Sequence, residues 1–169
     1  MTAQTSPSLH IVLFEPEIPH NTGAVGRTCV GLGAKLWLVR PMGFQLTDRL
    51  LKRAGLDYWP YLNYEIVNNW DALISRLEEE TGKTPAPWLF TSHAETDYTT
   101  VEYQHGDVLL FGSESRGVPD FVRQLCAQTS LRIPVSEEAR CLNLSVSVGI
   151  AAYEAIRQMS GRRQASRGA

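Results

Sequence analysis

Short, continuous apolar runs alternate along this chain with longer segments of helical periodicity. The apolar runs are bounded by glycine and proline and predict β-strands at residues 9–14, 35–39, 64–67, 88–91, 108–111 and 130–133. Helices are expected at residues 21–32, 48–54, 69–81, 119–127 and 143–159. Because strands separated by helices usually pair in parallel, the pattern predicts an α/β fold with helices on both faces of a parallel sheet.

Polar and glycine residues mark the ends of these predicted helices. Asn21 or Thr22 is expected to cap the first helix, and Gly33 to end it. Asn143 is expected to cap the last helix, which is the longest. The chain contains no internal repeat and no linker-like segment, so we expect a single domain over residues 1–160. Residues 161–169 are polar and basic and are expected to form a flexible tail.

Composition narrows the class of protein. The 169 residues are 43% apolar, which is typical of a globular domain, and no apolar run approaches the length of a membrane span. The polar start of the chain does not resemble a signal peptide, and three scattered cysteines fit a reducing compartment, so we expect a cytoplasmic protein. The net charge of −2 argues against a globally basic nucleic-acid binder, although a local basic patch stays possible.

Several common catalytic and cofactor motifs are missing from the sequence. No G-x-G-x-x-G follows the first predicted strand, which argues against a dinucleotide site. The four histidines lack the spacing of metal ligands, so no metal site is expected. A G-x-S-x-G nucleophile elbow is also missing, which disfavours an esterase of that type.

Three loop segments rich in glycine and small polar residues lie where a predicted strand passes into a helix. They span residues 21–27, 110–119 and 133–145. Ligands of α/β proteins bind at such junctions, so the three segments predict one composite pocket. In the first segment, Gly23 and Arg27 lie four residues apart and would share a helix face that can receive a phosphate.

Each segment also has an ordinary structural interpretation. The first could be a capped helix with an exposed arginine, and the second a long connection in which Glu114 pairs with Arg116. In the third, Asn143 could serve only as a helix cap. Taken one at a time, the segments do not decide between these interpretations and a functional one.

Together, the three segments resemble the motifs of the SPOUT class of RNA methyltransferases that modify ribose 2′-hydroxyls. The motifs read Asn21-x-Gly23-x-x-x-Arg27, then residues 110–117 (LFGSESRG), then Ile133-Pro134 followed by residues 143–145 (NLS). Within this class the chain is most similar to the bacterial tRNA (cytidine(34)-2′-O)-methyltransferases, whose signatures resemble residues 15–19, 41–44 and 53–58. The likeness covers about residues 9–158.

The resemblance implies a C-terminal trefoil knot, a homodimer and S-adenosylmethionine as the cofactor. By position, the residues that it implies for cofactor binding are Ser92, Gly112, Ile133, Cys141 and Leu142. The residues that it implies for catalysis are Arg27, Asn21, Glu114, Asn143 and Ser145. A guanidinium is protonated at ordinary pH, so Arg27 is expected to engage an RNA phosphate and the reacting hydroxyl instead of serving as a free base.

The implied activity is methylation of the ribose 2′-hydroxyl at the tRNA wobble nucleotide, position 34, which is a cytidine or a modified uridine. Methylation of another tRNA or rRNA ribose, or a non-catalytic RNA-binding module of the same fold, are the alternatives. Candidate phosphate contacts are Arg49, Lys52, Arg53, Arg140 and the tail residues Arg162, Arg163 and Arg167. Tyr58 and Trp59 would either stack on an anticodon base or pack in the core.

Overall fold

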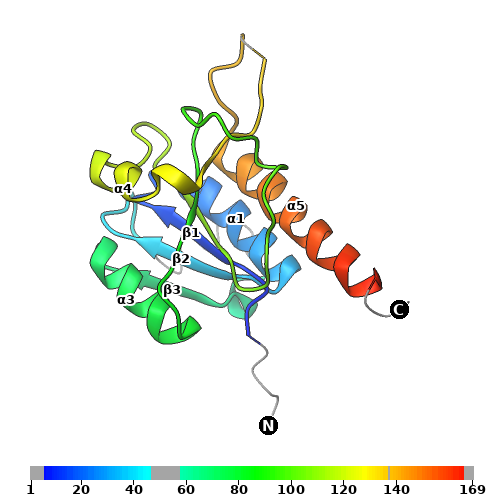
Figure 1. The fold of residues 1–169 in the computed structure, drawn as a ribbon. Helices are drawn as coiled ribbons and strands as arrows, with labels where there is room; N and C mark the ends of the chain where they lie inside the picture. Colours follow the sequence, from blue (N-terminus) through cyan, green and yellow to red (C-terminus); the bar gives the residue numbers. More distant parts are fainter. Residues whose placement is uncertain (1–5, 47–57, 137, 166–169) are drawn as a thin grey trace.

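The computed structural model describes residues 6–46, 58–136 and 138–165, with side chains up to residue 160. A six-stranded sheet, in which every paired neighbour is parallel, runs through the middle of the molecule (Figure 1). Its strands are β1 (His10–Phe14), β2 (Lys35–Val39), β3 (Tyr64–Val67), β4 (Trp88–Phe90), β5 (Val108–Phe111) and β6 (Ser130–Leu131). Their spatial order is β3-β2-β1-β5-β4-β6. The predicted parallel α/β sheet is therefore confirmed.

Helices cover both faces of this sheet, which explains why its strands are continuous apolar runs. One face packs against α1 (Pro19–Leu32) and α5 (Leu144–Ala165), and the other against α3 (Trp70–Thr81) and α4 (Asp120–Leu125) (Figure 1). Successive strand residues alternate between the two cores. Ile11 and Leu13 belong to the core under α1 and α5, whereas Val12 and Phe14 belong to the core under α3 and α4.

The predictions for three of the shorter helices need comment. The first helix begins at Pro19 with Ile18 as its N-cap, so the predicted cap at Asn21 or Thr22 is wrong, and both residues lie inside the helix. Proline is favoured at a first helical position, and the cap comes from a distant loop described below. The helix predicted at 119–127 ends at Leu125 and continues as a 3-10 turn, Ala127–Thr129. The helix predicted at 48–54 lies outside the described residues.

The last helix is longer than predicted. It runs from Leu144 to Ala165, so the first part of the segment expected to be a flexible tail has a helical backbone. Asn143 does cap it, because its carbonyl oxygen accepts from the Ser147 amide at 2.9 Å and its Oδ1 from the Ser145 amide at 2.9 Å. Tyr58 and Trp59 are both buried in the core, which settles their two interpretations in favour of packing.

The order of the strands creates one place suited to a ligand. From β1 the chain moves outward to β2 and β3, and later strands fill the opposite side through β5, β4 and β6. The carboxyl ends of β1 and β5 therefore flank a topological switch point, where open α/β sheets bind ligands. Among the described helices, none has the length and apolar character needed to cross a membrane. Side chains of His, Cys, Asp and Glu in the same residues form no group of three suited to a metal ion.

Candidate active site

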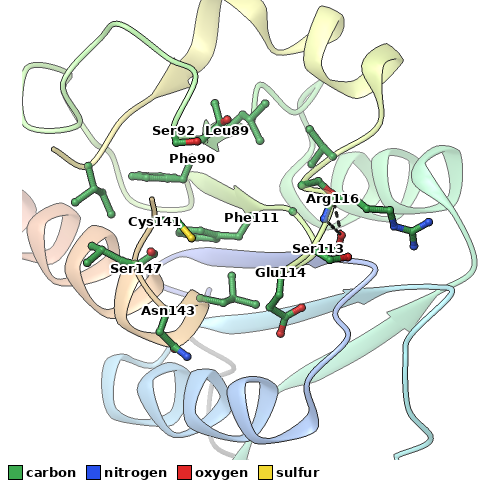
Figure 2. Close-up of a pocket in the computed structure, with 18 of the residues that line it drawn as sticks. Leu89, Phe90, Ser92, Phe111, Ser113, Glu114, Arg116, Cys141, Asn143 and Ser147 are labelled. Carbon is green, nitrogen blue, oxygen red and sulfur yellow. Dashed lines mark hydrogen bonds between the residues drawn. The ribbon is translucent and has the colours of Figure 1, made fainter. Parts of the chain in front are cut away.

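A cavity of about 500 Å³ opens at the carboxyl edge of the sheet, beside this switch point. Its walls come from the ends of β4 and β5, the loops that follow β4, β5 and β6, and the start of α1 and α5 (Figure 2). The predicted composite pocket is therefore present, because all three loop segments contribute to its lining. Its volume lies within the range of sites that enclose a small organic ligand.

Two phenylalanines form an aromatic floor in this cavity. Phe90 and Phe111 are register partners at the ends of β4 and β5, and their rings stack with centroids 4.8 Å apart and planes 13° from parallel (Figure 2). Ile133 and Leu142 add apolar surface to the same lining. A flat, apolar surface of this kind is suited to a purine ring.

Polar side chains from the three segments are joined by one chain of hydrogen bonds. The side-chain nitrogen Nδ2 of Asn21 donates to Glu114 Oε1 at 3.0 Å. The side-chain nitrogen Nδ2 of Asn143 donates to Asn21 Oδ1, also at 3.0 Å. Asn143 Oδ1 in turn accepts from the Ser145 amide at 2.9 Å and from the Ser145 hydroxyl at 2.7 Å. Residues separated by more than ninety positions therefore hold one another in place at the cavity.

Glu114 also supplies the missing cap of α1. Its carboxylate accepts from the backbone amides of Glu17 at 2.8 Å and Ile18 at 3.2 Å. A negative group at a helix N-terminus satisfies free amides and opposes the positive end of the helix dipole. The alternative in which Glu114 merely pairs with Arg116 is thus wrong, because Arg116 approaches Glu15 and Glu17 at 3.9 Å instead.

Glycine is needed at the base of the loop that carries Glu114. A Cβ atom on Gly112 would lie 2.6 Å from both the Cα of Gly117 and the amide nitrogen of Val118. The loop closes on itself here, since Ser113 and Gly117 exchange backbone hydrogen bonds of 3.0 and 2.9 Å. Gly117 itself has a φ of +69°, which glycine adopts without strain. The sequence folds this segment into a tight loop that can turn backbone groups toward the cavity.

The residues predicted for cofactor binding meet in this cavity. All five belong to its lining: Ser92, Gly112, Ile133, Cys141 and Leu142. Of the residues predicted for catalysis, Asn21, Glu114 and Asn143 line it as well. Ser145 lies next to Asn143 without belonging to the lining, and its two hydrogen bonds to Asn143 agree with a capping role.

Arg27 lies on the same helix as Asn21 but outside the cavity lining. Its guanidinium carbon lies 4.7 Å from the centroid of the Tyr58 ring, and its side chain is exposed. Tyr58 donates from its hydroxyl to the Gly23 carbonyl, which ties this aromatic ring to α1. Such a cation–π contact holds the guanidinium at the surface beside the ring.

The predicted RNA contacts are only partly visible. Arg140 is exposed, next to Cys141 in the loop that leads to α5. Arg49, Lys52 and Arg53 lie outside the described residues, as does Arg167. Arg162 and Arg163 fall within the helical backbone of α5, and their side chains are not described.

Some residues of the site have no counterpart in the sequence-based prediction. The Phe90–Phe111 stack was not anticipated, although both residues end apolar strands that flank the predicted loops. His93 and Arg123 also belong to the lining, as does Arg116 from the second predicted segment. The position of His93 shortly after a predicted strand was an available signal, whereas Arg123 lies on α4, where no local pattern marks it as part of a site.

Comparison with known proteins agrees with this geometry. Residues 8–153 match the model of the SpoU rRNA Methylase family. A tRNA (cytidine(34)-2'-O)-methyltransferase of Methylovorus glucosotrophus is 42% identical over 149 residues, which cover 88% of this chain and 94% of the relative. A solved structure on the 2-OH methylation of C/U34 on tRNA has a TM-score of 0.81 and 42% identity, covering 93% of this chain and 99% of its own.

A more distant solved structure supports the fold alone. AviRb of Streptomyces viridochromogenes, a SpoU methyltransferase solved in complex with the cofactor AdoMet, is 23% identical with a TM-score of 0.78. The likeness covers 91% of this chain and 58% of that one. The match to the family model spans most of the sequence, and it includes all three loop segments that form the cavity. The chain therefore belongs to the SpoU rRNA methylase family.

Proposed function

We propose that this protein transfers a methyl group from S-adenosylmethionine to the ribose 2′-hydroxyl of the tRNA wobble nucleotide, position 34. The observation that carries the proposal is the hydrogen-bonded chain of Glu114, Asn21 and Asn143 at the edge of the 500 Å³ cavity. Family membership supports the reaction type, and relatives about 40% identical that are named for cytidine 34 support the target.

The residues of the cavity fit an S-adenosyl ligand. The Phe90–Phe111 stack with Ile133 and Leu142 can hold the adenine, and backbone groups around Gly112 and Cys141 can bind its polar atoms. Ser92 would add a further polar contact after β4. When bound, S-adenosylmethionine supplies a methyl group on a positively charged sulfur, which leaves as a neutral thioether.

The protein's own contribution to this reaction is chiefly alignment. Holding two reactants in a reactive geometry lowers a barrier by up to roughly 7–11 kcal/mol. Hydrogen bonds join the side chains of Asn21, Glu114 and Asn143 to one another, and Glu114 also accepts from the Glu17 backbone amide. Because these bonds hold the three side chains in place, they can orient the ribose. Ser145 supports this group by its two bonds to Asn143.

Arg27 is proposed to bind the RNA beside the target hydroxyl. Its exposed guanidinium, held over Tyr58, can grip a phosphate with two N–H groups. An arginine side chain stays protonated, so the proton of the 2′-hydroxyl passes to a phosphate oxygen or another neighbouring acceptor. Arg140 and the basic positions Arg49, Lys52 and Arg53 are proposed as further contacts to the anticodon region.

The finer architecture is also part of the proposal. We expect the chain to form a trefoil knot around the cofactor loops and to work as a cytoplasmic homodimer. Exposed apolar residues on α5, Val146 at 48% and Tyr153 at 59%, offer a surface that a second copy would cover. Size-exclusion chromatography with light scattering measures the mass, and a monomer at micromolar concentration would contradict the dimer.

Mass spectrometry of nucleosides tests the activity. The protein is incubated with unmodified tRNA and, in a parallel reaction, with rRNA, each with isotopically labelled S-adenosylmethionine, and the labelled nucleoside is identified after digestion. A labelled 2′-O-methyl group at position 34 is expected; a label on a base, on another ribose or on rRNA alone would contradict the proposal. Arg27→Ala is expected to abolish turnover and to leave S-adenosylhomocysteine affinity within about threefold, since Arg27 lies outside the cavity.

The alternatives are distinguished by the same experiment. A ribose methyltransferase with another target would label a different tRNA or rRNA position. A non-catalytic RNA-binding module would bind tRNA and transfer no methyl group. The intact group of Asn21, Glu114 and Asn143 around a cavity of ligand size favours the catalytic role.

A further inference from the structure

Glu17 lies beside the active-site cavity without lining it. It belongs to the loop between β1 and α1, and the neighbouring loop at residues 113–117 forms one cavity wall. Its side chain is 29% exposed and reaches across the switch point toward that loop. The proposed reaction assigns no role to this residue.

Glu17 and the neighbouring loop are joined in both directions. The Glu17 backbone amide donates to Glu114 Oε2 at 2.8 Å. The Glu17 carboxylate accepts from the Ser115 amide at 2.9 Å and from the Ser115 hydroxyl at 2.6 Å. In each loop a carboxylate thus accepts a hydrogen bond from a backbone amide of the other loop. The paired residues are 97 and 98 positions apart in the sequence.

The loop that carries Glu17 is itself held from the opposite side. The Gly43 amide donates to the Pro16 carbonyl at 2.9 Å. A Cβ atom at Gly43 would lie 2.8 Å from the Cα of Glu17, so the two backbones are in close contact. The backbone at Glu17 is therefore held in place by its neighbours, so the Glu17 side chain can fix the position of the loop at 113–117.

We infer that Glu17 is a positioning residue that sets the cavity wall at 113–117 and thereby the affinity for the cofactor. This inference rests on the proposed function, because it assumes that the cavity binds S-adenosylmethionine. Ser115, Arg116 and Gly117 all line the cavity, so a shift of this short loop changes its shape directly. A loop of this kind is free to move unless side chains tie it to a neighbouring element.

The chemistry of the contact favours a role beyond surface charge. The hydrogen bond from the Ser115 hydroxyl holds the pKa of the Glu17 carboxyl below its usual value, so the group accepts as a carboxylate at neutral pH. Hydrogen bonds to an ionised acceptor are about twice as strong as neutral ones. The guanidinium of Arg116 lies 3.9 Å from this carboxylate and lowers its pKa less than the Ser115 hydroxyl does.

Glu17→Gln tests the inference. Glutamine keeps the shape but offers one acceptor oxygen to the two Ser115 donors, so the loop is held by fewer bonds. We expect S-adenosylhomocysteine to bind about tenfold more weakly by calorimetry, while kcat at saturating cofactor stays within about twofold. Hydrogen exchange should become faster at the amides of residues 113–117.

Glu78→Gln is the matched control. Glu78 is an exposed carboxylate on α3 that also accepts from a hydroxyl, that of Thr84, at 3.2 Å. This variant should bind S-adenosylhomocysteine like the unaltered protein. Equal affinities and equal exchange rates for Glu17→Gln and Glu78→Gln would overturn the inference, and so would a Glu17→Gln variant that loses kcat and keeps its cofactor affinity.

A double variant identifies the partner. Ser115→Ala removes the hydroxyl and is expected to weaken S-adenosylhomocysteine binding about threefold, and adding it to Glu17→Gln should cause little further loss, because both changes break one contact. Full additivity would show that Glu17 acts through something else. If unaltered protein binds S-adenosylhomocysteine but leaves tRNA unmethylated, the proposed function fails, whereas the affinities and exchange rates still decide the role of Glu17.

Discussion

The two edges of the sheet both place polar residues beside a cavity, but they connect them differently. At the carboxyl edge, Asn21, Glu114 and Asn143 are joined by hydrogen bonds among amides, a carboxylate and loop backbone. These residues come from three separate segments and face a cavity of about 500 Å³. The network orients side chains at the place where a ligand can enter.

At the amino edge the polar residues satisfy one another. Lys35, only 7% exposed, pairs with Glu65 at 3.0 Å and with Glu80, and its ammonium lies 4.0 Å from the centroid of the Trp37 ring. Trp37 donates its indole N–H to His10 Nδ1 at 3.1 Å. A second cavity of about 660 Å³ lies here, so cavity size alone does not identify the active site.

The contrast separates two uses of buried polar groups. Compensated charges at the amino edge contribute to stability, and removing one partner should lower the free energy of unfolding without altering the chemistry of the folded molecules. The network at the carboxyl edge contains a single carboxylate, that of Glu114, which is bonded to loop backbone and to Asn21. Substitutions in it should lower activity more than they lower the free energy of unfolding. Substitutions at the two edges therefore test the assignment of function to one of them.

The largest expected effect is that of Gly112→Ala at the carboxyl edge. The new methyl group would collide with backbone atoms of Gly117 and Val118, which cannot rotate away. We expect S-adenosylhomocysteine affinity to fall by about 100-fold or more by calorimetry, since a collision with fixed backbone costs at least as much as the ~1–3 kcal/mol of ordinary overpacking. Gly31→Ala near the end of α1, where nothing lies within 4 Å of the added Cβ, is the control and should bind normally. Normal binding by both variants would contradict the assignment.

Asn21→Ala should have the next largest effect. It removes the link between Glu114 and Asn143 while leaving the backbone of α1 in place. We expect kcat/KM for tRNA methylation to fall by about 100-fold through lost orientation, with little change in melting temperature. Thr28→Ala, on the same helix, removes only a local bond to the Ala24 carbonyl at 3.3 Å and serves as the control. Equal activities of the two variants would show that the network is structural.

The sequence predicted the sheet well because a strand buried on both faces must be apolar at every position. This rule identified β1, β2 and β5 almost to the residue. The predicted cap at Asn21 failed for a different reason. The group that caps α1 is the Glu114 carboxylate, which is 96 residues away from Ile18 in the sequence. A local sequence pattern cannot predict a partner at that distance.

The site shows the same division between local and distant signals. Glycine-rich segments after strands predicted one shared cavity, since parallel strands bring their carboxyl ends to one edge, but Arg27 and Ser145 do not belong to its lining. The stack of Phe90 on Phe111 and the contact of Glu17 with Ser115 depend on strand order, which periodicity does not determine. Likewise, the sequence predicts Lys35 only as the first residue of a strand. Its ion pairs with Glu65 and Glu80 depend on the packing of β3 and α3 beside β2, which the local pattern does not predict.

Lys35→Met tests the amino edge. Removing the ammonium takes from Glu80 its ion-pair partner among the described residues, although Glu65 keeps Arg76 at 2.7 Å. We expect unfolding by urea to show a loss of about 2 kcal/mol, as for a buried charged group that loses its hydrogen bonds. Methylation per folded molecule should be unchanged. Lys83→Met, an exposed lysine of the same cavity, should change stability by less than about 0.5 kcal/mol. A Lys35→Met protein of full stability but low activity would reverse the comparison.

The smallest effect is a pH dependence that His10 gives to the amino edge. Burial lowers the pKa of His10, with added repulsion from Lys35, His105 and Lys83 that Glu80 opposes. The unfolded chain binds a proton near pH 6.5 that the folded protein does not yet bind, so stability declines as pH falls below about 6.5, by at most about 1.4 kcal/mol per unit.

Replacing the imidazole isolates this contribution. His10→Asn keeps an oxygen that can accept from the Trp37 indole N–H but cannot take up a proton in this range. Urea unfolding of both proteins between pH 5 and 7.5 should give curves that converge as the pH falls, because only the unaltered protein loses the stability of its neutral histidine. Parallel curves would show that His10 is protonated in the folded state as easily as in the unfolded chain. Burial at the amino edge would then not exclude a charge on His10.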